Sequence, residues 1–265
     1  MYPRKKIGLP SSNILVPLYV YPAPGAWDPL FTAIACHPSL NFIIVVNPNN
    51  GPGSTSCPDA NYTREIPRLN SYANVQTVGY VSTDYAKRRL SLVLQDIKAY
   101  SAWSENANCL GLNMYGIFLD ETSSKYEPAS ALYYETIASA VRSEAGLGDN
   151  PLIIHNPGTV PDPRMLSPNI CDLSVVFEGA YSTYTMYNIG EQTSRLEASS
   201  NCGRDRLACI VHGVPTTLSS NDMIAFVNGL RTMVGSLFLT RLSVDYYASF
   251  SPRWVEFVSE MAEDS

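Results

Sequence analysis

Short apolar runs recur along the whole chain, and segments with a helical pattern separate them. Several of these runs are apolar throughout, as strands of a parallel sheet are when both faces are buried. Such an alternation is typical of βα units arranged around a parallel sheet. Eight runs are predicted to be strands: 13–21, 41–46, 75–81, 116–119, 152–155, 173–177, 207–212 and 236–240.

The connecting segments show apolar residues at three- and four-residue spacing, which predicts helices. The clearest are 84–103, 128–145, 219–234 and 252–261, and weaker patterns lie at 27–36 and 61–69. The proline-rich segment 156–169 is expected to hold at most a short helical turn. Eight strands with mostly helical crossovers favour a (β/α)8 TIM barrel over an open doubly wound sheet. Pro22-Ala23-Pro24-Gly25 follows the first run and is not a dinucleotide-binding fingerprint.

The length of 265 residues suits one domain of this kind, since about 250 residues is typical of such barrels. We expect residues 1–12 to be an N-terminal extension and residues 13–265 to form the barrel. Only 16% of the residues are charged, the net charge is −6, and no basic cluster follows Lys5-Lys6. Nucleic acid is therefore not an expected partner. We expect a monomer.

The cysteines and histidines do not form a metal motif. The three histidines lie far apart and no two cysteines have the C-x-x-C spacing. We therefore expect no metal and no cofactor.

The cysteine count bears on the cellular compartment. Six cysteines and the acceptor motif Asn61-Tyr62-Thr63 indicate an oxidising, extracellular route. No apolar stretch is long enough to span a membrane. We expect a secreted or cell-surface protein whose signal or anchor is not part of these residues. Cys171–Cys202 is the expected disulfide, because both residues precede strands that should be neighbours, whereas Cys209 is expected to be a buried thiol.

Two of the predicted strands end in carboxylates. The run 116–119 stops at Asp120-Glu121, and the run 173–177 stops at Glu178. A pair of carboxylates held by rigid elements is what hydrolysis of a glycosidic bond requires. Each acid taken alone could equally cap a helix or pair with a basic residue. Because two apolar runs both end in carboxylates, a catalytic role is favoured.

Other polar and aromatic residues fall at the carboxyl ends of the predicted strands, where the active sites of TIM barrels lie. They suit a hydroxyl-rich substrate, although strand ends are polar in many proteins and aromatic residues there often serve packing. The expected substrate-binding residues are Tyr21, Asn47, Tyr80, His155, Asn156, Tyr181, His212, Asp245 and Tyr246. Tyr181 is expected to lie with Tyr184 and Tyr187 in a loop after Glu178.

Taken together, several segments resemble the spherulin 4 family, which is classed as glycoside hydrolase family 135. They are residues 16–22 with Trp27 downstream, 47–53, 79–81, 116–121 and 177–178. The resemblance covers roughly residues 14–257 and implies a (β/α)8 barrel. It also implies endo-acting hydrolysis of the polysaccharide galactosaminogalactan at α-1,4-linked N-acetylgalactosamine stretches. The acidic trio of the family matches Asp120, Glu121 and Glu178.

The three acids are expected to have different roles. Neighbouring strand residues face opposite sides, so Asp120 and Glu121 should not both reach the reacting atom. We expect Asp120 to be the nucleophile or charge stabiliser, Glu178 the general acid, and Glu121 a residue that orients one of them or binds sugar hydroxyls. Strands four and six lie two apart, about 9–10 Å, and inward-leaning side chains would close most of that gap. A separation of ~5–5.5 Å and a retaining mechanism are therefore expected.

Other functions remain compatible with these residues. Related barrels cut deacetylated galactosamine polymers, and an acidic cleft would suit such a cationic substrate. In a second alternative, Glu121 or a substrate N-acetyl group replaces Asp120 as the nucleophile. A sugar-binding barrel without catalysis would keep the polar ring but would not need Asp120 and Glu178 together. A structural wall protein is a further alternative, whereas a metal-dependent deacetylase is disfavoured.

Overall fold

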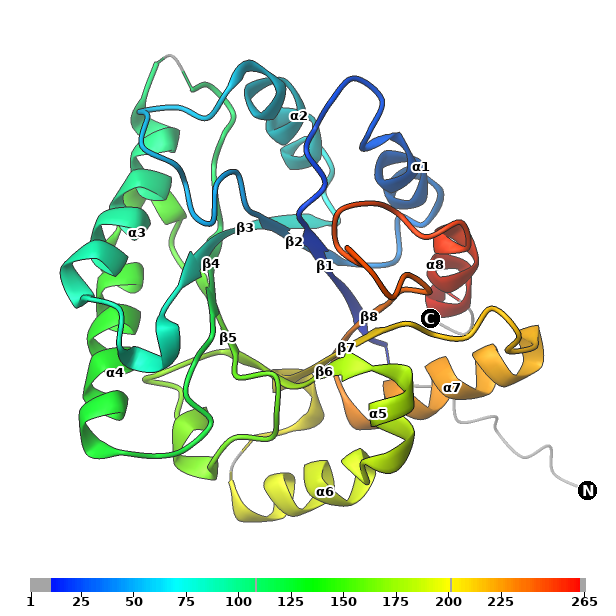
Figure 1. Ribbon diagram of the computed structural model, residues 1–265. Coiled ribbons are helices and arrows are strands. Elements are labelled where there is room, and N and C mark those ends of the chain that lie inside the picture. The colour runs from blue at the N-terminus through cyan, green and yellow to red at the C-terminus, as the bar shows by residue number, and fades with distance from the viewer. Residues whose placement is uncertain (1–10, 108, 201, 263–265) are drawn as a thin grey trace, which may run out of the picture.

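The computed structural model describes residues 11–107, 109–200 and 202–262. Eight parallel strands form a closed barrel in which each strand pairs with the next in sequence, and β8 pairs with β1 (Figure 1). The predicted single-domain (β/α)8 barrel is therefore confirmed. The strands are β1 Asn13–Leu18, β2 Phe42–Val46, β3 Val75–Ser82, β4 Gly116–Asp120, β5 Leu152–Asn156, β6 Leu173–Ala180, β7 Leu207–His212 and β8 Ser236–Leu239.

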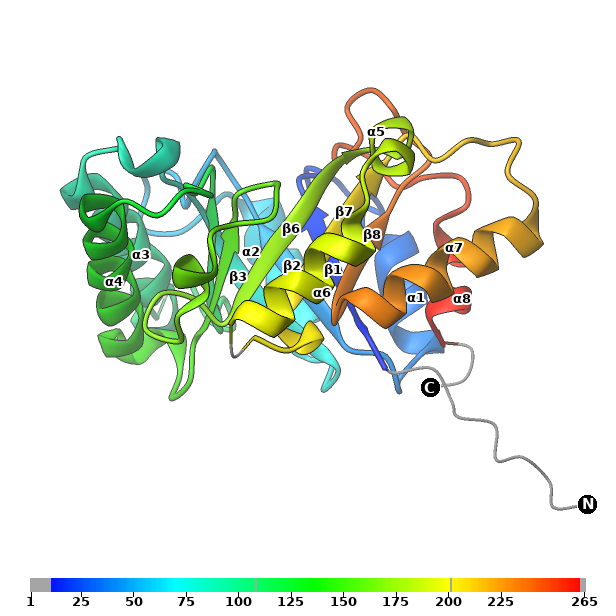
Figure 2. The ribbon, with the colours of Figure 1, turned by 90° about the horizontal axis from the view of Figure 1, so that it is seen from below.

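Helices surround the barrel on its outside (Figure 1 and Figure 2). They are α1 Asp28–Cys36, α2 Ala60–Asn70, α3 Leu90–Glu105, α4 Pro128–Ser143, α5 Tyr181–Met186, α6 Ile189–Ser199, α7 Ser220–Met233 and α8 Trp254–Ala262. Side chains at N-terminal boundaries explain two of these starts, because Asp59 caps α2 and Ser219 caps α7. None of the helices in the described part of the chain is long and apolar enough to cross a membrane.

Two connections differ from the sequence-based prediction, the one between β3 and β4 and the one between β6 and β7. The predicted helix 84–103 is divided into a single turn, η1 Asp84–Ala86, and α3, because all three residues of η1 have left-handed backbone angles. Left-handed residues cannot continue a right-handed helix. Tyr181 begins the short helix α5 rather than lying in a loop, and α6 was not predicted at all. The proline-rich segment holds only the short turn η3 Pro163–Leu166, as expected.

The barrel wall is close-packed against the helices. Large side chains such as Trp27, Tyr100 and Trp103 are fully buried in this layer. Gly79 on β3 shows how tight the packing is, because a Cβ atom there would lie 2.6 Å from the ring of Tyr100. A residue larger than glycine would force the Tyr100 ring, and α3 with it, away from the sheet.

The disulfide lies elsewhere than predicted. Cys57 and Cys109 are bonded, with a Cα–Cα distance of 5.9 Å. They join the loop before α2 to the segment between α3 and β4. Cys171 and Cys202 are free, buried thiols, so the expected Cys171–Cys202 disulfide was wrong. Their sulfur atoms point at different backbone carbonyls, those of Met165 and Gly203, instead of at each other.

Candidate active site

The carboxyl end of β4 holds Asp120 among three hydrogen-bond donors. The Tyr80 hydroxyl donates to Asp120 Oδ2 at 2.8 Å. The other oxygen, Oδ1, accepts from Asn156 Nδ2 at 2.8 Å and from the Glu121 backbone N–H at 2.9 Å. These donors come from β3, β5 and the residue that follows β4, so the end of the barrel wall fixes the orientation of the carboxylate.

The second carboxylate, Glu178, faces Asp120 across the barrel mouth. Asn156 Nδ2 also donates to Glu178 Oε2, at 2.5 Å, and the Tyr247 hydroxyl donates to Oε1 at 2.5 Å. Because one nitrogen contacts both acids, Asp120 Oδ1 and Glu178 Oε2 are no further apart than the sum of the two distances, 5.3 Å. This limit is compatible with the ~5–5.5 Å separation typical of retaining glycosidases.

The strand that carries Glu178 is irregular. Pairing of β6 with β7 shifts between Val175 and Phe177, and the strand then continues to Ala180, beyond its predicted end. A bulge of this kind changes which way the following side chains point, and bulges are common beside active sites. The bulge sets the register of the residues after it. In this register Glu178 contacts Asn156 and Tyr247.

Burial controls the protonation of this cluster. It raises the pKa of Asp120, the hydrogen bond from Tyr80 works against that rise, and the negative charge of Glu178 adds to it. Burial also raises the pKa of Tyr80, Tyr247 and Tyr19, and the neighbouring carboxylates raise it further. The three tyrosines therefore stay protonated, and Tyr80 and Tyr247 donate hydrogen bonds to the carboxylates.

Glu121 is turned away from the pair. Its backbone is left-handed, with φ of 53°, and its carboxylate accepts from the Ser82 hydroxyl at 2.6 Å. The left-handed turn η1 supports this conformation, since the Tyr85 N–H donates to the Glu121 carbonyl at 2.6 Å. Left-handed non-glycine residues cost of order 1–3 kcal/mol each and often cluster at functional sites.

Most of the other expected binding residues lie around the barrel mouth. Tyr80 and Asn156 contact the carboxylates directly. The rings of His212 and Tyr246 stack in parallel, with centroids 4.0 Å apart. Asp245 is exposed in the loop after β8.

The remaining expected residues lie further out. Tyr21 is half-exposed and its hydroxyl accepts from Asn61. Asn47 holds the loop after β2, because its side-chain oxygen accepts a hydrogen bond from the Gly51 N–H. Tyr181 packs edge-on against Phe226 of α7.

His155 corrects the sequence-based prediction. It precedes Asn156 on β5, so its side chain faces the opposite side of the strand. There it is buried against the Tyr134 ring of α4, with ring centroids 4.9 Å apart. Burial lowers its pKa to about 3. The neutral ring is part of the packing between sheet and helix and does not reach the carboxylates.

Two tyrosines at the centre of the site were not among the expected substrate-binding residues. Tyr19 packs edge-on between Tyr80 and Tyr247, with centroid distances of 5.6 and 5.4 Å. Its place at the end of the first predicted strand was a usable signal. Tyr247 lies in the long segment between β8 and α8, beside the expected Tyr246, and no local pattern distinguishes the two.

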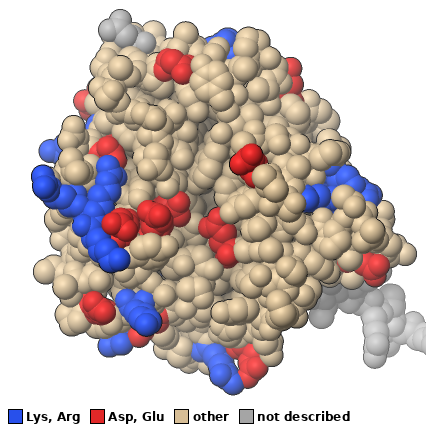
Figure 3. Space-filling view, viewed as in Figure 1, with Lys and Arg blue, Asp and Glu red and all other residues tan. Residues whose placement is uncertain are grey.

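The face at the carboxyl ends of the strands is hollowed at its centre. Acidic side chains gather at this hollow, whereas lysines and arginines lie toward the edge of the face (Figure 3). Among the described residues, no three His, Cys, Asp or Glu side chains are grouped so that they could hold a metal ion. The fold and this site together define a single-domain (β/α)8 barrel with a carboxylate pair at its catalytic end, the arrangement on which glycoside hydrolases rely.

The family follows from comparison with known proteins. Residues 13–261 match the family described as "Spherulation-specific family 4" (Spherulin4), and the chain belongs to this family. The resemblance to the spherulin 4 family is thus confirmed. Spherulin-4 of Physarum polycephalum is 39% identical over 170 residues, which is 64% of this chain and 46% of that protein. The matched part is therefore less than half the length of this relative.

Solved structures support the same grouping. Aspergillus clavatus Sph3, crystallised in complex with GalNAc, is 43% identical, with a TM-score of 0.89 over 96% of this chain and 98% of Sph3. An endo-beta-1,4-mannanase from Thermotoga petrophila has a TM-score of 0.59 at 10% identity over 98% of this chain and 77% of its own. A GH18 chitinase from Pseudoalteromonas aurantia has a TM-score of 0.54 at 11% identity over 94% of this chain and 100% of its own. These last two share the barrel fold.

Proposed function

We propose that the protein is an endo-acting glycoside hydrolase that cleaves α-1,4-linked N-acetylgalactosamine stretches of galactosaminogalactan. The observation that carries the proposal is the pair Asp120 and Glu178, held through one amide of Asn156 with oxygens at most 5.3 Å apart. A similar protein, Sph3, is crystallised with GalNAc, which supports this choice of sugar.

In the proposed mechanism Asp120 attacks the anomeric carbon while Glu178 protonates the leaving oxygen. Three donors around Asp120 stabilise its ionised form, as a nucleophile requires. Glu178 then removes a proton from the water that hydrolyses the glycosyl–enzyme ester. Glu121 orients Asp120 through its backbone N–H, which donates to the Asp120 carboxylate. The tyrosines offer ring faces and hydroxyls to the sugar.

Binding roles are proposed for the residues around the mouth. The His212–Tyr246 stack and the half-exposed Tyr21 offer flat surfaces for neighbouring sugar rings. Asp245, Asn47 and Tyr181 are proposed to contact hydroxyl groups further along the polymer. An endo-acting enzyme needs such contacts on both sides of the cleaved bond.

One observation favours a second substrate. The acids gathered at the central hollow would attract a cationic polymer, so deacetylated galactosamine stretches are an alternative (Figure 3). Secretion is part of the proposal, because the Cys57–Cys109 disulfide requires an oxidising compartment to form.

The test is incubation with purified galactosaminogalactan, before and after enzymatic deacetylation, with mass spectrometry of the released oligosaccharides. Asp120→Asn and Glu178→Gln should each lower the rate by ~10²–10⁴-fold. Glu135→Gln, an exposed position on α4, serves as the control and should leave the rate unchanged. Release of oligosaccharides only from the deacetylated polymer would move the assignment to the alternative, and release from neither would refute hydrolysis of this polymer.

A further inference from the structure

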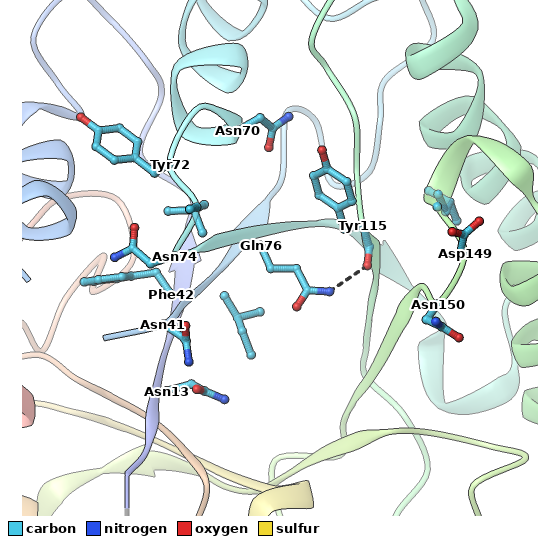
Figure 4. A pocket seen from close by; sticks show the side chains of 15 residues that line it. Asn13, Asn41, Phe42, Asn70, Tyr72, Asn74, Gln76, Tyr115, Asp149 and Asn150 are labelled. Atoms are coloured by element: carbon cyan, nitrogen blue, oxygen red, sulfur yellow. Dashed lines mark hydrogen bonds between the residues drawn. The ribbon is translucent and has the colours of Figure 1, made fainter. Parts of the chain in front are cut away.

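A cavity of about 560 Å³ opens at the end of the barrel away from Asp120 and Glu178. The first residues of β1, β2 and β3, the residue before β4 and the loop before β5 line it (Figure 4). Its polar lining includes Asn13, Asn41, Gln76, Tyr115, Asp149 and Asn150. The proposed catalytic pair lies at the carboxyl ends of the strands, so this cavity is a separate site.

Two further asparagines in the wall already have structural roles. Asn74 Nδ2 donates to the carbonyl of Leu40 at 2.9 Å, and Asn70 Nδ2 donates to the carbonyl of Asn113 at 2.9 Å. These bonds satisfy backbone carbonyls in the connections beside the cavity. They hold the wall in shape without any bound molecule.

The other polar groups are not used in this way. The side chains of Asn13, Asn41 and Asn150 make no hydrogen bond within the described residues. Gln76 donates from Nε2 to the Tyr115 carbonyl at 3.1 Å, which leaves its amide oxygen available. Each free amide offers both a donor and an acceptor. Sugar hydroxyls and acetamido groups need partners of both kinds.

The arrangement of these groups is ordered. Ile14 pairs with Phe42, and Phe42 pairs with Val75. The preceding asparagines, 13, 41 and 74, therefore lie level with one another where these adjacent strands begin. Neighbouring strands are about 4.8 Å apart. Asn13 and Asn41 lie on one side of the hollow, with Asp149 and Asn150 on the other (Figure 4).

We propose that this cavity binds a neutral oligosaccharide segment of a glycan, at a second site distinct from the catalytic end. The described residues that line it include no Lys or Arg, so an anionic ligand would meet no counter-charge from them. Its volume lies within the ~300–1,000 Å³ typical of ligand sites. The inference rests on the proposed function only in the choice of sugar. Exposed amides are ordinary on a surface, but here unpaired amides converge on one concave region.

The experiment is a titration of the 15N-labelled Asp120→Asn protein with an α-1,4-linked N-acetylgalactosamine hexasaccharide, followed by NMR. The signals are the side-chain amides of Asn13, Asn41 and Asn150, with Asn156 reporting on the catalytic end. Saturable shifts in both groups are expected. Shifts at Asn156 alone would overturn the second site and keep the proposed function. Shifts at Asn13, Asn41 and Asn150 alone would support the second site and count against binding at the catalytic end. Shifts in neither group would overturn both the second site and the proposed function.

Affinity at the second site gives an independent readout. Asn41→Ala and Asn150→Ala should each weaken the saccharide affinity measured there by roughly fivefold, the effect of one lost hydrogen bond. Both side chains are exposed and support no other residue, so the fold should not change. Asn221→Ala, on the exposed surface of α7, is the matched control. Unchanged affinity in both variants would overturn the assignment of these amides.

Discussion

Asp120 and Glu178 share a single hydrogen-bond donor, the side-chain amide nitrogen of Asn156. The two carboxylates come from β4 and β6, and the donor comes from β5 between them. The positive end of the amide dipole therefore lies between the two carboxyl groups, where it stabilises negative charge on either of them. This contact lowers the repulsion between the acids and fixes their separation.

Replacing Asn156 with Asp should nearly abolish hydrolysis. The variant keeps the shape of the side chain, removes the shared donor and adds a third acidic group beside the other two. We expect a fall in kcat of roughly 10²-fold or more. Steady-state kinetics on the polymer measures this, and Asn169→Asp at an exposed position is the control. A rate close to that of the unchanged protein would show that the shared amide is not needed.

The variant Tyr80→Phe should move the acidic limb of the pH–rate profile to higher pH. The hydrogen bond from Tyr80 lowers the pKa of Asp120, opposing the effect of burial, so its loss raises that pKa. A nucleophile works only when ionised, and activity is therefore lost at a higher pH than before. Tyr133→Phe on α4, which loses a hydrogen bond to the Arg88 carbonyl and not to a carboxylate, is the control. A limb that stays in place or moves to lower pH would contradict the assignment.

Thiol counting under denaturing conditions should find four free cysteines among the six, because only Cys57 and Cys109 are bonded. Their sequence separation of 52 residues corresponds to a chain-entropy contribution of about 4 kcal/mol. Cys57→Ser should lower the free energy of unfolding in urea by up to that amount. Cys36→Ser, at an exposed free thiol, should change little. Equal stability of the two variants would argue against the disulfide.

The buried His155 should make the protein sensitive to acid. Its pKa of about 3 lies below that of the unfolded chain, so the native state holds it neutral. The contribution of this group to the free energy of unfolding is fully present above pH ~6.5. It declines by up to about 1.4 kcal/mol per pH unit as the pH falls toward the pKa of His155 in the folded protein. His155→Leu should flatten this dependence in urea unfolding at pH 7, 6 and 5. A slope unchanged from the original protein would contradict the burial effect.

The sequence predicted the barrel well because buried parallel strands and amphipathic helices leave strong local patterns. Asp120 and Glu178 were visible for the same reason, since each follows an apolar run directly. His155 and Asn156 were both placed in the site, yet adjacent residues of a strand face opposite sides, and only Asn156 reaches the carboxylates. Applying the two-residue period to β5 would have separated them.

Features that depend on distant contacts were not predictable in this way. Tyr247 reaches Glu178 from a connection 69 residues away, and no pattern around it marks that contact. The left-handed turn Asp84–Ala86 contains no glycine to signal it. The disulfide joins two irregular segments, 52 residues apart, which come together because α2 and α3 both pack against β3.

The configuration of the first sugar product tests the central claim most directly. If Asp120 is the nucleophile and Glu178 the acid/base, hydrolysis proceeds through a glycosyl–enzyme ester and retains configuration. Proton NMR during the first minutes of digestion of α-1,4-linked N-acetylgalactosamine oligosaccharides should then show the α anomer forming first. Initial release of the β anomer would contradict the account, because it would mean that water attacks directly and that Asp120 forms no bond to the substrate.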